Sequence, residues 1–259
     1  MEQEFLTKSF VAPSGFQYVI REENGADEEI LSNMASVREG MNISNFISAI
    51  VVSTNFTSSG KLTPEDTLDL PVLDRYCILL QSRIFSLGPV LEFTHTWPGA
   101  VSPVRYEQDL TELIYDNYEN ITEEEVKKKP MALPAYGDVE VAQAIKFKGY
   151  EVILSSGKKI KFDYLNGHAE KYSLTLPEEK QNRNSDLVAR NLCLEVNGKW
   201  EKVENFSMFK VREMAEIRNI IGKLDPMWNG LTDIDNPVTL EKTWVSVFAQ
   251  PRFFFLTEA

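Results

Sequence analysis

The sequence has few of the residues that build metal and nucleophilic sites, with only two cysteines and two histidines among 259 residues. Cys77 and Cys193 each lie in an apolar stretch and form no CxxC pair, so we expect two buried, reduced thiols and no zinc site. Neither GxGxxG nor GxxxxGK[ST] occurs, which leaves no phosphate-binding loop for a dinucleotide or triphosphate. These absences predict a protein without metal or cofactor.

Basic residues are also scarce, with 27 Lys and Arg against 39 Asp and Glu and a formal net charge of −12. Binding to nucleic acid depends on Lys and Arg that neutralise phosphates, so direct nucleic-acid contact is not expected. No apolar run approaches the ~18 residues of a membrane span. The opening MEQEFLTKSF lacks the basic and apolar regions of a signal peptide. We therefore expect a cytosolic protein that does not cross a membrane.

Apolar residues make up 43% of the chain and aromatic residues 11%, enough to build a core. Period-2 alternation predicts hairpins near 8–23 and 150–162, each turning at Ser-Gly. Further patterns favour short helices, helix-to-strand units and two long helices. These elements are expected at residues 27–37, 44–56, 72–88, 185–203 and 208–226.

Two stretches match at a constant offset of 142 residues: PSGFQYVIREENGADE (13–28) and SSGKKIKFDYLNGHAE (155–170). The identical columns are Ser14/Ser156, Gly15/Gly157, Asn24/Asn166, Gly25/Gly167 and Glu28/Glu170. We predict an α+β fold of two related modules, each a β-hairpin followed by helices and short strands. The first would span 1–130, with a linker from about 110, and the second 131–259, ending in a C-terminal strand. Convergence on common turn residues is the alternative.

No residue stands out as catalytic. His168 lies at a helix start, and its counterpart in the first stretch is Ala26, so a solvent-facing histidine is the expectation. His95 is expected at a strand end, with no neighbouring nucleophile to form a dyad or triad. Clustered acidic residues are explained by helix starts, where carboxylates meet the positive end of the helix dipole. We therefore predict that the protein is not an enzyme.

The candidate interface residues are Phe253, Phe254 and Phe255, together with Trp97. Neighbouring residues of a strand point to opposite faces, so three consecutive phenylalanines would need cover on both sides. That cover is either the protein's own core or a partner at an assembly interface, and the sequence leaves both open.

Several motifs occur in an order that resembles a T4-type tailed-phage family of baseplate hub subunits and hub assembly proteins. They are PSG–Y–I–RE, NISNFISAIV and LPVLDRYCILLQSRIFSLG, then VILSSGKKIKFDYLNG, MFKVREMAEIRNIIGKLDP, DIDNP and the terminal FFF. Members often carry a CPxCG-like zinc knuckle after the first long helix, where this chain reads THTWPGAVSP. The resemblance therefore implies no metal in this chain, and Trp97 is expected to take the place of the zinc as the local packing centre.

The resemblance implies a non-enzymatic structural or assembly component, or assembly chaperone, of a phage tail baseplate hub or related contractile injection apparatus. Its partners would be other baseplate and tail hub proteins, and a homo-oligomer stays open. It would act in the host bacterial cytoplasm during assembly or remain in the virion tail baseplate. The alternative is an acidic cytosolic adaptor or inhibitor that binds a basic host protein. An unrecognised enzyme is a third reading.

Overall fold

The computed structural model describes residues 5–113, 149–224 and 230–255. Within these ranges the chain forms eight α-helices and eleven β-strands, and all strand pairs are antiparallel. The fold is therefore of the α+β class, as predicted. The predicted boundary between modules, near residues 130–145, and the predicted linker beyond residue 113 lie outside the described residues.

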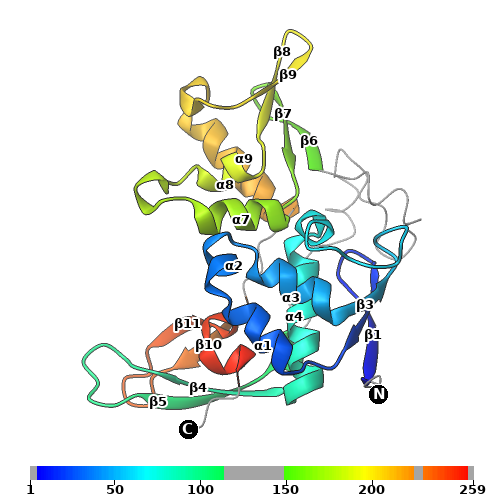
Figure 1. Ribbon diagram of the computed structural model, residues 1–259. Coiled ribbons are helices and arrows are strands. Elements are labelled where there is room, and N and C mark those ends of the chain that lie inside the picture. Colours follow the sequence, from blue (N-terminus) through cyan, green and yellow to red (C-terminus); the bar gives the residue numbers. More distant parts are fainter. Residues whose placement is uncertain (1–4, 114–148, 225–229, 256–259) are drawn as a thin grey trace.

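The first half builds the larger core around a three-stranded sheet of order β1-β2-β3. Three helices precede the long helix α4, which crosses the centre of the molecule (Figure 1). A separate hairpin, β4–β5, follows α4. The elements are β1 (Thr7–Val11), β2 (Gln17–Arg21), α1 (Gly25–Ser32), α2 (Met34–Arg38), α3 (Asn42–Ile50), β3 (Val51–Thr54), α4 (Val72–Leu87), β4 (Val90–His95) and β5 (Val104–Asp109).

The second half has its own core beneath a four-stranded sheet of order β6-β7-β8-β9. It lies at the top of Figure 1, where α7 rests against the first half. The elements are β6 (Gly149–Ile153), β7 (Lys159–Asp163), α7 (Gly167–Thr175), α8 (Ser185–Ala189), β8 (Cys193–Val196), β9 (Lys199–Lys202) and α9 (Val211–Leu224).

The C-terminal elements return to the first half instead of extending the second. They are β10 (Leu231–Asp235), β11 (Lys242–Ser246) and α10 (Pro251–Phe254). Ile234, Val247 and Phe253 are buried in the core of the first half. The prediction that the terminal phenylalanines form a strand is wrong, because Pro251 starts a short helix there. Proline suits the first helical position, where its missing N–H is not needed.

Two local predictions needed correction in detail. The helix expected over 27–37 is interrupted at Asn33, whose side chain accepts hydrogen bonds from the N–H groups of Ala35 and Ser36 and so caps α2. The helix expected over 72–88 has its apolar pattern on one broad face in the sequence, but in α4 nearly every residue from Val72 to Arg83 is buried. Neighbours cover α4 on all sides because β2, α3, α7 and the C-terminal elements surround it.

The two predicted hairpins match in geometry at the same offset of 142 residues. Strand β6 begins 142 residues after β1, β7 begins 142 after β2, and α7 begins 142 after α1. In both hairpin tips the glycine has a positive φ and donates its N–H to the carbonyl three residues earlier. Asn24 and Asn166 both cap the helix that follows. Descent of the halves from one duplicated module stays a prediction.

Candidate interaction sites

The predicted interface residues of the C-terminus are largely internal. Phe253 is only 1% exposed and its ring lies 4.8 Å from the rings of both Phe248 and Phe254. Phe254 and Phe255 are half-buried against the same core. Successive helical residues point about 100° apart, so the three rings do not alternate across a sheet as the sequence suggested.

Trp97 is buried as well. Its Nε1 donates to the hydroxyl oxygen of Tyr106 at 2.8 Å, and that hydroxyl donates to the backbone carbonyl of Asp235 at 2.9 Å. His95 lies at the end of β4, as predicted, with its ring edge-on to Trp97 at 5.0 Å. Trp97 therefore joins β4–β5 to β10–β11 from inside and offers no side chain to a partner.

These two hairpins form one unit, called here the double hairpin, which consists of β4, β5, β10, β11 and their loops. The hydroxyl of Thr232 donates to the side-chain oxygen of Gln108, in addition to the Tyr106 contact. Both hairpins extend toward the lower left of Figure 1. Their separate sheets are thus held side by side by polar contacts across β5 and β10.

The double hairpin exposes large apolar side chains. Trp244, on β11, is 64% exposed, and Val101, Val238 and Leu240 project from the two loops. Sequence reasoning missed Trp244. A signal was present, since period-2 alternation in TWVSV puts Trp244 on the face opposite the half-buried Val245.

The two halves meet at a desolvated ion pair. Arg75, 1% exposed in α4, donates through Nε to Glu170 of α7 at 2.9 Å, and its Nη2 lies 2.8 Å from the same oxygen. The Nη1 group donates to the backbone carbonyl of Thr67 at 2.7 Å. Gly167 at the start of α7 packs so closely that an added Cβ would lie 2.7 Å from Leu68 Cα. The close approach explains why glycine is needed at this contact.

A polar cleft of about 470 Å³ opens beside this junction. His168 is half-exposed there, and its Nε2 lies 3.3 Å from Asp69 Oδ1 in the first half. Asp66 and Asp163 also line the cleft, which gives it an acidic character. The prediction that His168 faces solvent from a helix start is confirmed, and its contact with Asp69 across the junction is new.

Each hairpin tip is held by an acidic residue at the third position of a long helix. Ser14 donates to Asp74 of α4 through both its N–H, at 3.0 Å, and its hydroxyl. The Tyr18 hydroxyl also donates to Asp74, at 3.0 Å. Complete burial nevertheless raises the pKa of Asp74 to about 6.

The corresponding acid of the second half behaves in the opposite way. Glu213 of α9 accepts hydrogen bonds from Ser156, the backbone N–H of Lys210 and the ammonium of Lys158. These bonds, with Ser156 the largest contribution, lower the pKa of Glu213 to about 2. The two tips are therefore built alike but respond to pH differently.

We expect Asp74 to make the folded protein less stable as the pH rises from about 4 to about 6. The unfolded carboxyl ionises near its ordinary pKa of 3.8, whereas the folded one keeps its proton until about 6. The loss, complete above pH 6, amounts to roughly 3 kcal/mol. Asp74→Asn cannot ionise, so its unfolding free energy relative to wild type should rise by this amount between pH 4 and pH 7. Urea denaturation measures both proteins, and a difference independent of pH would contradict the expectation.

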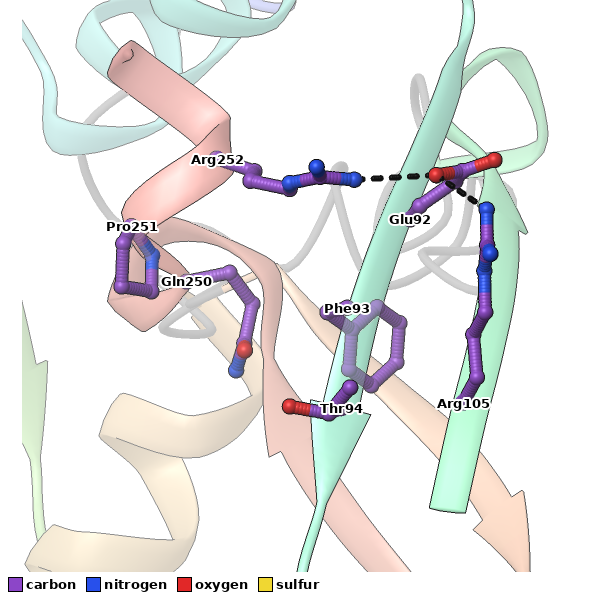
Figure 2. A pocket seen from close by; sticks show the side chains of 7 residues that line it. All are labelled: Glu92, Phe93, Thr94, Arg105, Gln250, Pro251 and Arg252. Carbon is purple, nitrogen blue, oxygen red and sulfur yellow. Dashed lines mark hydrogen bonds and ion pairs between the residues drawn. The ribbon is translucent and has the colours of Figure 1, made fainter. Parts of the chain in front are cut away.

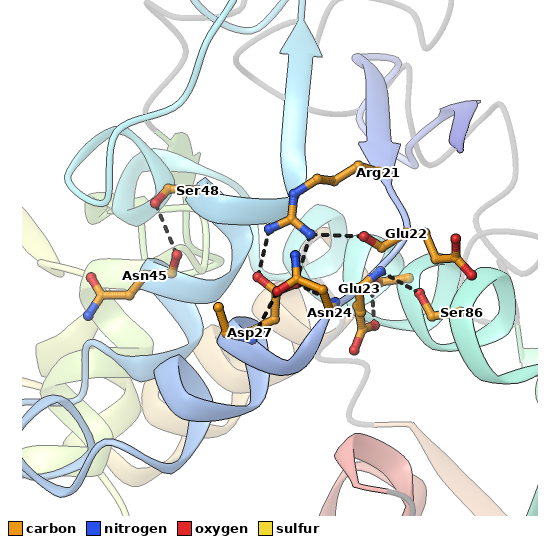
Figure 3. A network of polar contacts seen from close by, with 10 residues as sticks. Arg21, Glu22, Glu23, Asn24, Asp27, Asn45, Ser48 and Ser86 are labelled. Atoms are coloured by element: carbon orange, nitrogen blue, oxygen red, sulfur yellow. Dashed lines mark hydrogen bonds and ion pairs between the residues drawn. The ribbon is translucent and has the colours of Figure 1, made fainter. Parts of the chain in front are cut away.

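A second polar network joins the end of β2 to the start of α1 (Figure 3). Arg21 donates to both carboxylate oxygens of the buried Asp27, each at 2.7 Å. Asp27 also accepts from the backbone N–H of Asn24, which completes a capping box. Burial raises the pKa of the neighbouring Glu23, despite the hydrogen bond donated by Ser82. The side chains of this network therefore hold the end of β2 against the start of α1.

A third feature is the cleft between α10 and the β4–β5 hairpin, drawn in Figure 2. Arg105 reaches Glu92 from β5, and Arg252 reaches it from α10. Both guanidinium groups contact the same oxygen, Oε2, from opposite sides. This arrangement ties the C-terminal helix to the double hairpin.

Metal-site chemistry has no support in the part of the chain that the structure describes, where no three His, Cys, Asp or Glu side chains gather as ligands. Cys77 is buried and Cys193 is half-buried, so the prediction of two buried thiols is confirmed for Cys77 alone. Both cysteines are free thiols. Among the same residues no helix combines the length and apolarity that a membrane crossing requires.

Comparison with known proteins adds no assignment, since no protein-family model, curated protein or solved structure matches the chain.

Proposed function

We propose that the protein is a non-enzymatic structural or assembly component of a phage tail baseplate hub or a related contractile injection apparatus. The exposure of Trp244 on the double hairpin is the observation that supports a role in protein–protein interaction. Tryptophan is enriched among residues that dominate binding energy, and large exposed apolar side chains mark interaction surfaces. The hub assignment rests on the order of motifs in the sequence.

The way the body of the protein is built supports this role. The Arg75–Glu170 pair and the Trp97–Tyr106–Asp235 chain of hydrogen bonds hold separate elements in fixed positions. An assembly component needs such rigid modules because ordering a flexible surface on binding costs affinity. We also propose that the two halves arose by duplication, which is supported by the matching hairpins, glycine turns and asparagine caps.

A site-specific photo-crosslinker tests the proposal. Introduced at Trp244, it should give cross-links to tail or baseplate proteins in infected cells. The same group at Val211, which is exposed on α9, serves as the matched control and should give much lower yields. Mass spectrometry of the products identifies the partners. Equal yields at the two positions, or products without any tail protein, would contradict the proposal.

The alternative, an acidic adaptor or inhibitor of a basic host protein, is favoured by one observation. The junction cleft gathers Asp66, Asp69 and Asp163 in a protein of net charge −12. Opposite charges on two proteins speed their association, and added salt weakens this attraction. A crosslinker at Ser58, which lines that cleft, should then capture a basic host protein in place of a tail protein.

A further inference from the structure

Strand β11 forms an open edge of the double hairpin. Among the described residues it pairs only with β10, so no strand lies along its other side. In continuation of this ladder, the N–H of Val247 donates to the carbonyl of Gly230 at 2.8 Å. Hydrogen-bonded and non-bonded pairs alternate along an antiparallel ladder. The backbone N–H and C=O groups of Lys242 and Trp244 therefore point away from β10.

The outward backbone groups of this edge are available to a partner. Within residues 5–113, 149–224 and 230–255, the N–H and C=O groups of Lys242 and Trp244 form no hydrogen bond on the outer side of β11. The opening ends at Ser246, whose carbonyl accepts a hydrogen bond from Gln250 Nε2 at 3.1 Å. A row of unpaired N–H and C=O groups is a template for a further extended chain. The edge thus offers two donors and two acceptors to such a chain.

The side chains beside this edge define what the added chain should carry. Trp244 is 64% exposed and lies directly opposite Asp233 of β10, in a non-bonded pair that brings the two side chains close. Asp233 is exposed and forms no ion pair with any residue that the structure describes. Asp235, on the same face, already contacts Lys242 at 3.5 Å. An aromatic ring beside an unpaired carboxylate suits a basic side chain, which is attracted by both.

We propose that an extended segment of a partner protein pairs antiparallel with the edge of β11 and lays an Arg or Lys side chain across Trp244 toward Asp233. The inference names the partner's chemistry for the proposed assembly role and rests on that role. The net charge of −12 also favours a basic segment over an acidic one. Backbone pairing supplies affinity, and the basic side chain supplies specificity.

A second copy of this chain fits the edge less well. Antiparallel self-pairing centred on Trp244 would set Lys242 opposite Ser246 of the copy, but Gln250 already occupies the Ser246 carbonyl. Two chains that each carry a net charge of −12 also repel one another. The partner is therefore a different protein.

Fluorescence anisotropy with labelled, end-blocked peptides tests the proposal on the full chain. The probe is Ser-Thr-Val-Arg-Val-Thr-Ser, whose arginine stands opposite Trp244 and whose valines face the half-buried Thr243 and Val245. Methylation of the arginine backbone nitrogen removes an N–H that points at β11, so binding should weaken at least about 10-fold. Methylation of the next valine nitrogen removes an N–H that points away and should change binding less than about 2-fold.

Substitutions then locate the site. Gln in place of the peptide arginine should weaken binding about 5- to 10-fold, and so should Asp233→Asn. Trp244→Thr keeps a residue that favours strands but removes the ring, and should weaken binding about 10-fold. The matched controls are Glu204→Gln, in an exposed loop of the second half, and Trp200→Thr, on the edge strand β9. Neither control should change binding.

Protection of backbone amides reports the pairing directly. The bound probe should slow the hydrogen exchange of the Trp244 amide, measured by NMR, because its outward N–H gains a partner. The proposal is overturned if this amide stays unprotected at saturating peptide. It is also overturned if N-methyl-arginine weakens binding no more than N-methyl-valine, or if the Arg and Gln peptides bind equally.

Self-association of the protein that Trp244→Thr abolishes would also overturn the proposal, in favour of a second copy on the edge. Sedimentation velocity measures this association. Thermal melts verify that each variant is folded, and Asp233→Asn tests the site independently if Trp244→Thr unfolds. Cross-links from Trp244 to a tail protein test the assembly role separately. If these cross-links form but the peptide results fail, the assembly role stands and strand addition at β11 is wrong.

Discussion

Glu170→Ala should lower the free energy of unfolding by roughly 3 to 5 kcal/mol, because it leaves a buried guanidinium without its carboxylate partner. Arg75 is buried in α4, and both its Nε and Nη2 contact Glu170. Arg75 also donates to the backbone carbonyl of Thr67 and the hydroxyl of Ser44, but these groups are neutral and do not compensate the guanidinium charge. Urea denaturation at pH 7 gives the difference directly.

A surface ion pair provides the control. Lys159 and Glu195 lie 3.0 Å apart with both side chains partly in solvent. Glu195→Gln should therefore cost only about 0 to 1 kcal/mol. Glu170→Gln, which keeps an oxygen acceptor but removes the charge, should fall between the two. If Glu170→Ala stays within about 1 kcal/mol of wild type, Arg75 does not depend on the pair and the junction is held by other contacts.

Phe253→Ala should also cost roughly 3 to 5 kcal/mol, because it opens a cavity in the core of the first half. Phe253 is packed between Phe248 and Phe254 and is almost fully buried. Phe255→Ala is the matched control, since the same side chain is removed from a half-buried position. It should cost clearly less. Thermal and urea unfolding of the three proteins provide the comparison.

This pair of variants separates the two readings of the terminal phenylalanines. A core role predicts a large loss of stability for Phe253→Ala, with partner binding lost only to the extent that the protein unfolds. An interface role predicts nearly unchanged stability with lost cross-linking at Trp244. The second pattern would show that the burial of Phe253 is not what stabilises the first half.

Local patterns in the sequence were sufficient for much of the fold. The Ser-Gly turns predicted the hairpins, and the acidic residues after Asn-Gly predicted the helix starts, because such residues act on their immediate neighbours. The switch from helix to strand at Ile50 and Val51 was predicted from a change of period alone. These elements needed no information about distant contacts.

Long-range packing could not be predicted in the same way. The all-round burial of α4 depends on elements far along the chain, including Glu170 and Phe248. The return of 231–255 to the first core rests on contacts such as Arg252 with Glu92, 160 residues apart. A run of phenylalanines indicates burial, but the sequence does not say against which surface.

The candidate sites show the same division. Phe253 was singled out as one of three consecutive phenylalanines, and Trp97 as the expected packing centre of its loop, and both proved to be internal. Trp244 was overlooked although its strand alternates regularly. The Arg105–Glu92–Arg252 arrangement joins a strand hairpin to a helix from the other end of the chain, so no local motif could have indicated it.

The return of the C-terminus to the first core has a consequence for biosynthesis. Ile234, Val247 and Phe253 complete a core whose other residues are translated much earlier. During translation the second half has its own core and can fold before that completion. The core of the first half stays incomplete until residues 234–253 have left the ribosome. Nascent chains released before residue 253 should therefore be the species that chaperones and proteases recognise.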